Sequence, residues 1–355
     1  MSRGAVFRRR KRVVTSTIAA AAIALLLFAA PAEATFPGQN GKLAFSSCGP
    51  DDCGIFVSAA DGSNPVQITH NPEFIILHGT IRMVDTYPAW SADGSRIAYA
   101  RVHANGDTEV RIANADGSGD RSLIAGTQPA WSPDGTRVAF ARPGHAIAVV
   151  NADGSGPVNL ATGIASGPDW SPDGQRIAFA ASLGIETEIV SMNLDGSNRV
   201  LVTSGSPGAG ASDPSWSPDG GRLAFERGPT TIDPTELFIV NADGSDLTQL
   251  TENSPDFPEP SGPDDEGPAW SPDGSLIVVS RVTGAGTLYT IRPDGTGLTS
   301  LGRGGTTPAW QPLPGPQRAD YKNASKFCKA LRDFLGDEQF AEQYGNLGKC
   351  VSRNH

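Results

Sequence analysis

A small set of histidine and acidic side chains in this sequence has the residue types that bind a metal ion. His103 and Asp107 lie in one short loop, and Glu186 and Asp233 lie in two others. Together they would supply the ligands of a metal-dependent polysaccharide lyase, provided that the fold brings them to one point. The five histidines show no spacing typical of metal ligands, so we expect no metal site. A Gly-x-Ser-x-Gly motif is absent from the sequence, which argues against a serine hydrolase.

Two longer loops carry further candidate binding residues. The loop 70–87 contains the apolar run 74–77, which either forms a contact patch or packs as core. The loop 252–266 is rich in acids and proline. Loops on a rigid scaffold often carry binding residues, so this second loop is either a site for calcium or a basic partner, or a solvated insertion. We expect no cofactor, with calcium as the one ion considered. The candidates that these loops add are His78, Arg82, Asp264, Asp265 and Glu266.

All of these loops connect the units of a sequence repeat. Each unit begins with Pro-x-Trp, which the first five copies continue as Ser-Pro-Asp-Gly or, once, Ser-Ala-Asp-Gly. A run such as Arg-Ile-Ala-Phe follows, and later an Asp-Gly-Ser or Asp-Gly-Thr turn. The repeat therefore contains every tryptophan of the chain, namely Trp90, Trp131, Trp170, Trp216, Trp270 and Trp310.

The repeat predicts an all-β fold made of four-stranded antiparallel blades. Ser-Pro-Asp-Gly is a tight turn, because proline presets φ, aspartate caps its own backbone and glycine takes the left-handed position. The runs between the turns are short strands, and four of them every 40-odd residues are typical of a β-propeller blade. The series starts with an Arg-Ile-Ala-Phe-type run at 42–45 that has no Trp phrase before it, and it ends with the Trp310 phrase, which has no strands after it. We therefore expect a six-bladed β-propeller in which the C-terminal Trp strand completes the N-terminal blade.

The repeat phrase resembles the WD40-like (PD40) repeat of TolB-type propellers. The resemblance covers residues 36–312 and rests on Pro-x-Trp-Ser-Pro-Asp-Gly-x-x-Ile-Ala-Phe and Asn-Ala-Asp-Gly-Ser. It implies a six-bladed propeller in the cell envelope or outside the cell. It implies less about function, because the same blades occur in binding proteins, peptidases and lyases. TolB carries an α/β domain before its propeller, whereas only about seven residues separate Ala34 from Lys42 here. This departure argues against the role of TolB itself in the Tol–Pal system.

The two ends of the chain differ in character from the repeat. Residues 1–34 combine six basic residues, an apolar run and an Ala-Glu-Ala site, the pattern of a secretory signal peptide. We therefore assign 1–34 to a signal peptide, 35–312 to the propeller and 313–355 to a linker with a small helical tail. In an exported protein four cysteines favour two disulfides. Three pairings are possible, and the local one is the simplest: Cys48 with Cys53, and Cys328 with Cys350.

Composition limits the classes of partner. The formal net charge of −10 argues against nucleic acid. No segment after the signal peptide approaches the 18 apolar residues of a membrane span. We expect a secreted or envelope protein, monomeric and non-catalytic, that binds a protein or glycan. The alternative is a propeller enzyme, either a lyase or a peptidase-related hydrolase, that uses the face of the inter-blade loops.

Overall fold

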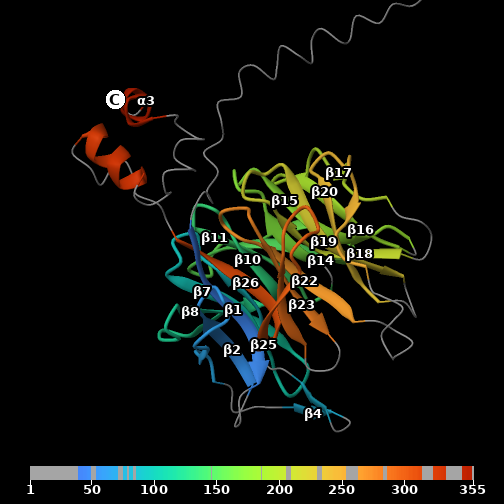
Figure 1. Cartoon of the computed structure of the whole chain (residues 1–355). Coiled ribbons are helices and arrows are strands. Elements are labelled where there is room, and N and C mark those ends of the chain that lie inside the picture. The colour runs from blue at the N-terminus through green and yellow to red at the C-terminus, as the bar shows by residue number, and fades with distance from the viewer. Residues whose placement is uncertain are drawn as a thin grey trace, which may run out of the picture. The chain divides into compact units, whose positions relative to one another are not determined.

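The structure is a computed structural model, shown in Figure 1. Within the residues it describes, no helix is both long enough and apolar enough to cross a membrane. The leader 1–34 lies outside these residues, so the signal peptide and the domain boundaries remain predictions. The described residues are 39–48, 53–70, 75–77, 80–82, 85–144, 146–184, 186–204, 209–229, 234–252, 263–282, 286–313, 323–332 and 346–353.

The described chain forms six four-stranded antiparallel sheets, which are the blades of a propeller. This confirms the predicted fold. Each blade begins with a Pro-x-Trp strand, which we call the inner strand because all six line one central cavity. The strands, in order from the inner strand outwards, are as follows: blade 1, β6 (Asp85–Trp90), β7 (Arg96–Val102), β8 (Thr108–Asn114) and β9 (Arg121–Ala125); blade 2, β10 (Thr127–Trp131), β11 (Arg137–Arg142), β12 (Ala146–Asn151) and β13 (Val158–Ala161); blade 3, β14 (Ala165–Trp170), β15 (Arg176–Ser182), β16 (Thr187–Asn193) and β17 (Val200–Leu201); blade 4, β18 (Ala209–Trp216), β19 (Arg222–Pro229), β20 (Glu236–Asn241) and β21 (Thr248–Gln249); blade 5, β22 (Asp264–Trp270), β23 (Ile277–Val282), β24 (Thr287–Ile291) and β25 (Thr299–Gly304); blade 6, β26 (Thr306–Leu313), β1 (Gln39–Cys48), β2 (Cys53–Ser58) and β3 (Val66–Gln67).

Blade 6 is built from both ends of the propeller, as the repeat predicts. Strand β26 pairs antiparallel with β1, with Leu43 opposite Trp310 and Ala44 opposite Ala309. Figure 1 shows β26 and β1 side by side, although one lies near the end of the chain and the other near its start. This pairing joins the two ends of the propeller within one sheet and closes the ring.

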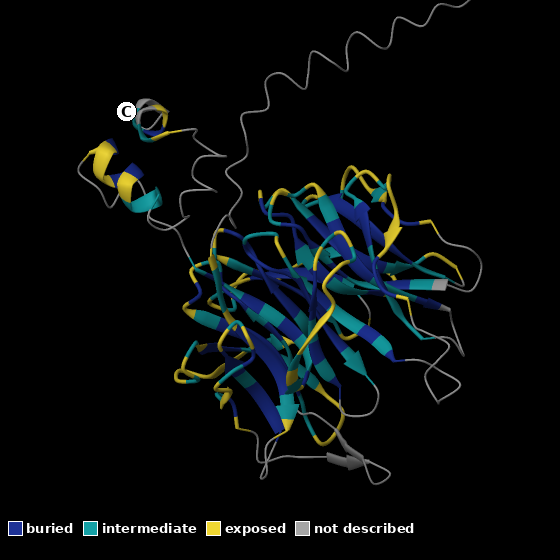
Figure 2. Ribbon diagram, in the orientation of Figure 1, coloured by how far each residue is buried: buried dark blue, intermediate teal, exposed yellow. Residues whose placement is uncertain are grey.

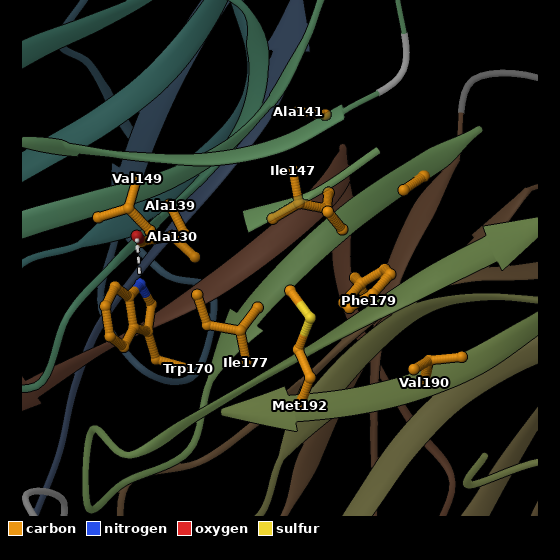
Figure 3. Close-up of a cluster of buried hydrophobic side chains, with 12 residues drawn as sticks. Ala130, Ala139, Ala141, Ile147, Val149, Trp170, Ile177, Phe179, Val190 and Met192 are labelled. Carbon is orange, nitrogen blue, oxygen red and sulfur yellow. Dashed lines mark hydrogen bonds between the residues drawn. The ribbon is translucent and has the colours of Figure 1, made fainter. Parts of the chain in front are cut away.

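The core lies between neighbouring blades. In Figure 3, Ile177 and Phe179 of blade 3 face Ala139 and Ile147 of blade 2 within one cluster of buried side chains. Trp170 belongs to the same cluster, and its indole N–H donates a hydrogen bond of 3.2 Å to the Ala130 carbonyl. Figure 2 shows the same pattern across the ring, with buried middle strands and exposed turns. Each second strand is sandwiched between blades, which explains why Arg-Ile-Ala-Phe is apolar without the alternation of a one-sided sheet.

The Ser-Pro-Asp-Gly segments are the tight turns that the sequence predicts. In blade 3, Ser171 Oγ donates to Asp173 Oδ1 over 2.6 Å, and the Gly174 N–H donates to the Ser171 carbonyl over 2.8 Å. Gly174 has φ +66°, the left-handed conformation that favours glycine. The arginine of the preceding second strand then stacks on the next tryptophan, with Arg137 Cζ 5.0 Å from the centre of the Trp170 ring.

Both disulfides form with the local pairing that the sequence favours. Cys48 and Cys53 face each other in the β1–β2 register and are bonded. Cys328, in the helix 324–332, is bonded to Cys350 in the helix α3 (Leu347–Arg353). Around the second disulfide, Phe327 packs with other apolar side chains of the two helices in a small cluster of their own.

Candidate binding site in the central channel

The six inner strands enclose a central cavity of about 230 Å³. Every blade contributes its Pro-x-Trp segment and the residue before it to the lining. Because proline and tryptophan recur in every blade, they give the channel a constant frame. The residue before the proline and the centre of Pro-x-Trp both vary among the blades, so these two positions give the sides of the channel different chemistry. The residue before the proline varies more, and we call it the variable residue.

This variable residue has a left-handed backbone in all six blades. Each inner strand also shows a register irregularity against its neighbour at this point. A residue before proline normally adopts an extended conformation, and a left-handed non-glycine residue costs about 1–3 kcal/mol. Four of the six positions carry such a side chain. The residues and their φ values are Tyr87 (53°), Gln128 (50°), Gly167 (56°), Asp213 (46°), Gly267 (60°) and Thr307 (48°).

Three pairs of these residues are joined by hydrogen bonds around the channel. The Gln128 side chain donates from Nε2 to Asp213 Oδ1 over 3.0 Å and accepts from the Gly167 N–H at Oε1 over 3.0 Å. On another part of the ring, Thr307 Oγ1 accepts from the Tyr87 N–H over 3.2 Å. The variable positions therefore form contacts across blade boundaries, in addition to lining the cavity.

Three carboxyl groups of blades 4 and 5 interact at this level of the channel. Burial raises the pKa of Asp213, and it raises the pKa of Glu226, which the Asp213 charge raises further. Glu226 accepts from the Gly267 N–H and from Ser212 Oγ, both over 2.9 Å. Burial also raises the pKa of Glu266, with added repulsion from Asp264 and Asp213. The pKa of each of these three groups, which we call the channel carboxylates, is raised above its ordinary value, and a bound cation would favour their ionised form.

The negative charge of the channel carboxylates also affects the phenol of Tyr87, which belongs to blade 1. Burial raises its pKa most, and the charges of Asp213, Glu226 and Glu266 raise it further. A hydrogen bond between the Gln128 and Tyr87 side chains lowers this pKa. Tyr87 thus stays protonated and presents a neutral hydroxyl towards the channel carboxylates.

A fourth acid, Asp169, is partly buried and lines the same cavity. Asp169 occupies the variable centre of Pro-x-Trp in blade 3, and its Oδ2 accepts a 2.8 Å hydrogen bond from the Trp216 N–H of blade 4. Burial raises its pKa to about 7, although this hydrogen bond lowers it. The carboxyl therefore links two blades while it lines the channel.

The candidate residues predicted from the sequence are distributed around the ring. Of those described, Glu266 interacts with the channel carboxyl of Asp213, whereas Asp265 is fully buried and pairs with Arg281 at 2.7 Å. Asp264 Oδ1 accepts from the Thr235 N–H over 2.9 Å, joining blades 4 and 5. Arg82 lies in the strand β5 (Thr80–Arg82), which pairs with β4 (Ile75–Leu77). Two candidates, His78 and Asp233, lie outside the described residues.

The predicted set of metal ligands makes local contacts in its own loops. His103 Nε2 lies 3.2 Å from Glu109 Oε1, and Asp107 Oδ2 accepts from Asn105 within the same turn. Glu186 lies in another turn, where its carbonyl accepts from the Leu183 N–H. Within the part of the chain that the structure describes, no group of three or more His, Cys, Asp or Glu side chains is arranged to hold a metal ion.

Most of the channel residues were not among the candidates predicted from the sequence. The repeat phrase was interpreted there as structural throughout. The missed signal was the variation inside the phrase, because the residue before proline changes while its neighbours do not. That variation marks Tyr87, Gln128, Asp213 and Thr307, and Glu226 then follows as the one acid at its position in the second strands.

Comparisons with known proteins agree with this architecture. A comparison of the sequence with curated proteins finds no match. One similar solved structure is TolB from Acinetobacter baumannii, with 19% identity and a TM-score of 0.62, and the match covers 77% of this chain and 67% of that one. Another is putative TolB from Agrobacterium tumefaciens, with 18% identity and a TM-score of 0.58, and the match covers 76% of this chain and 92% of that one. A chain of a nidogen/laminin complex is also similar, with 12% identity and a TM-score of 0.58, and the match covers 77% of this chain and 98% of that one. At these identities the likeness establishes the fold alone. The family model for PD40, the TolB beta propeller domain, matches residues 42–314, and the chain therefore belongs to this family.

Proposed function

We propose that the protein is an exported, non-catalytic binding scaffold whose central channel receives a cationic group of a protein or peptide ligand. The observation that carries this proposal is the convergence of Asp213, Glu226 and Glu266 beside a cavity framed by all six blades. Buried carboxyls with raised pKa values are poorly solvated, so a partner's ammonium or guanidinium group would relieve them.

Two further observations support parts of this proposal. The two disulfides and the TolB-type relatives are consistent with an exported protein. Among charged groups away from the channel, Asp85 is paired with Arg101 and Asp265 with Arg281, both at 2.7 Å. These pairs join adjacent strands of their own blades and so serve the scaffold.

The proposal is tested by titrating the protein with a tetra-arginine peptide that has blocked ends, using calorimetry at pH 7. Asp213→Asn should weaken binding about tenfold, the equivalent of about 1.4 kcal/mol, because one carboxylate of the site is removed. Asp243→Asn removes the same charge from an exposed turn of the same blade and should leave the affinity unchanged. Equal weakening by both variants would show that the peptide binds the acidic surface in general and would contradict a channel site.

A further inference from the structure

The Gln128 side chain makes an unusual contact, because it bonds to a blade that is not adjacent to its own. It belongs to blade 2, yet it hydrogen bonds to Asp213 in blade 4, 85 residues along the chain. Blade 3 lies between these two blades and has Gly167, which has no side chain, at the equivalent position. A Cβ atom there would lie 2.7 Å from Asp213 Oδ1, so a larger residue would displace the oxygen to which Gln128 donates. The glycine thus permits the approach between blades 2 and 4.

The two partners of Gln128 form a matched pair of hydrogen-bonding groups. Asp213 Oδ1 is an acceptor and receives the Gln128 Nε2 donor, while the Gly167 N–H is a donor and binds Gln128 Oε1, each over 3.0 Å. All three residues line the central cavity. An acceptor beside a donor is the complement of a primary carboxamide, and also of the N–H and C=O that one extended peptide residue presents on the same side.

The blade itself does not need a side chain at this position. Two of the six blades have glycine there with the same left-handed backbone, namely Gly167 and Gly267. Gln128 instead has a non-glycine side chain at φ 50°, where L-residues are strained. The glutamine therefore contributes its carboxamide to the channel, and the backbone geometry would be served equally well by glycine.

We propose that Asp213 and the Gly167 N–H form an amide-binding subsite, which the chain's own Gln128 carboxamide occupies and which the backbone N–H and C=O of one extended residue of a peptide ligand take over by displacing it. This inference rests on the proposed function, since it names the second group of the same ligand. Asp213 Oδ2, Glu226 and Glu266 remain for the cationic side chain. Gln128 is then an internal competitor that sets the affinity of the channel.

Other ligand groups fit this pair less well. A guanidinium supplies donors to Asp213 but has no acceptor for the Gly167 N–H. A carboxylate accepts from the N–H but is repelled by Asp213. The N–H and C=O of one extended residue satisfy both partners, so peptides are favoured over free amines or anionic sugars.

The test compares wild type with Gln128→Gly, which empties the subsite and keeps the left-handed backbone. The probe is N-acetylglycine N-methylamide, followed by NMR titration, with methylguanidinium and acetate as control probes. The variant should bind the amide at least tenfold more tightly than wild type and show no such gain for either ion. Thr307→Gly, the matched control, changes the same repeat position elsewhere in the ring and should gain nothing.

Two results would overturn the inference. One is a folded Gln128→Gly protein, confirmed by its melting curve, that binds the amide no better than wild type. The other is an equal gain for Thr307→Gly. Should either glycine variant fail to fold, Gln128→Asn keeps the amide but shortens its reach, and it should show the same selective gain. Failure of the proposed function is distinguishable, because tetra-arginine would then not discriminate Asp213→Asn while the amide probe still discriminated Gln128→Gly.

Discussion

Replacing Asp169 with asparagine should stabilise the protein at alkaline pH. The carboxyl is raised to a pKa of about 7 by burial, and its Oδ2 accepts from the Trp216 N–H. Asparagine keeps an acceptor oxygen for that N–H but has no charge to desolvate. The variant therefore removes the titration and retains the link between blades 3 and 4.

The direction and size of the effect follow from the pKa. The folded-state pKa lies above the usual value of 3.8, so the folded protein binds the proton more tightly than the unfolded chain. Stability is accordingly lost as pH rises from about 4 to about 7, and the loss is complete above pH 7. A pKa difference of about 3 corresponds to about 4 kcal/mol. Asp169 is only partly buried and lines the channel, so solvent screens its charge and reduces the expected loss to about 2 kcal/mol.

Urea unfolding followed by tryptophan fluorescence measures this effect, because all six indoles lie in or beside the core. At pH 8 Asp169→Asn should be about 2 kcal/mol more stable than wild type, which is roughly 4–8 °C in melting temperature. At pH 4.5 the two proteins should be nearly equal. Asp153→Asn is the control of opposite sign, since hydrogen bonds from Ser155 lower the Asp153 pKa and its contribution is lost as pH falls. If Asp169→Asn is destabilised equally at all pH values, Asp169 acts as an ionised acceptor and the reasoning is wrong.

Three other changes test the scaffold. Truncation before Pro308 removes Trp310 and the pairing with β1, so it should abolish cooperative unfolding; a truncated chain that melts like the full one would contradict ring closure. Asp265→Ala leaves Arg281 half-buried without its carboxylate and should cost about 3–5 kcal/mol in urea unfolding, with recovery expected when Arg281→Met is added. Loss of the Cys328–Cys350 disulfide should cost the two-helix segment about 3 kcal/mol, and proteolysis should then cleave this segment while the propeller remains intact.

The blades were predictable from the sequence because each is specified locally. Ser-Pro-Asp-Gly sets its turn within four residues, and the position of Trp310 after the last full unit was enough to predict closure on 42–45. The channel site depends on distances that sequence does not carry. Asp213 and Gln128 are 85 residues apart, and their contact exists because Gly167 leaves space between them.

Even so, the ring geometry shows why the channel, more than the loops, is the place where such a protein becomes specific. Six near-identical blades give the same proline and tryptophan to every side of the cavity, so the constant frame by itself offers a ligand no preferred orientation. The variable position breaks this symmetry. At this position a carboxyl group comes from blade 4 alone, whereas Tyr87 and Thr307 join blades 1 and 6 through a neutral hydrogen bond. In the proposed binding mode a peptide with a cationic side chain would be held in a single orientation, and substituting Gln128 or Asp213 should change binding while leaving the blades in place.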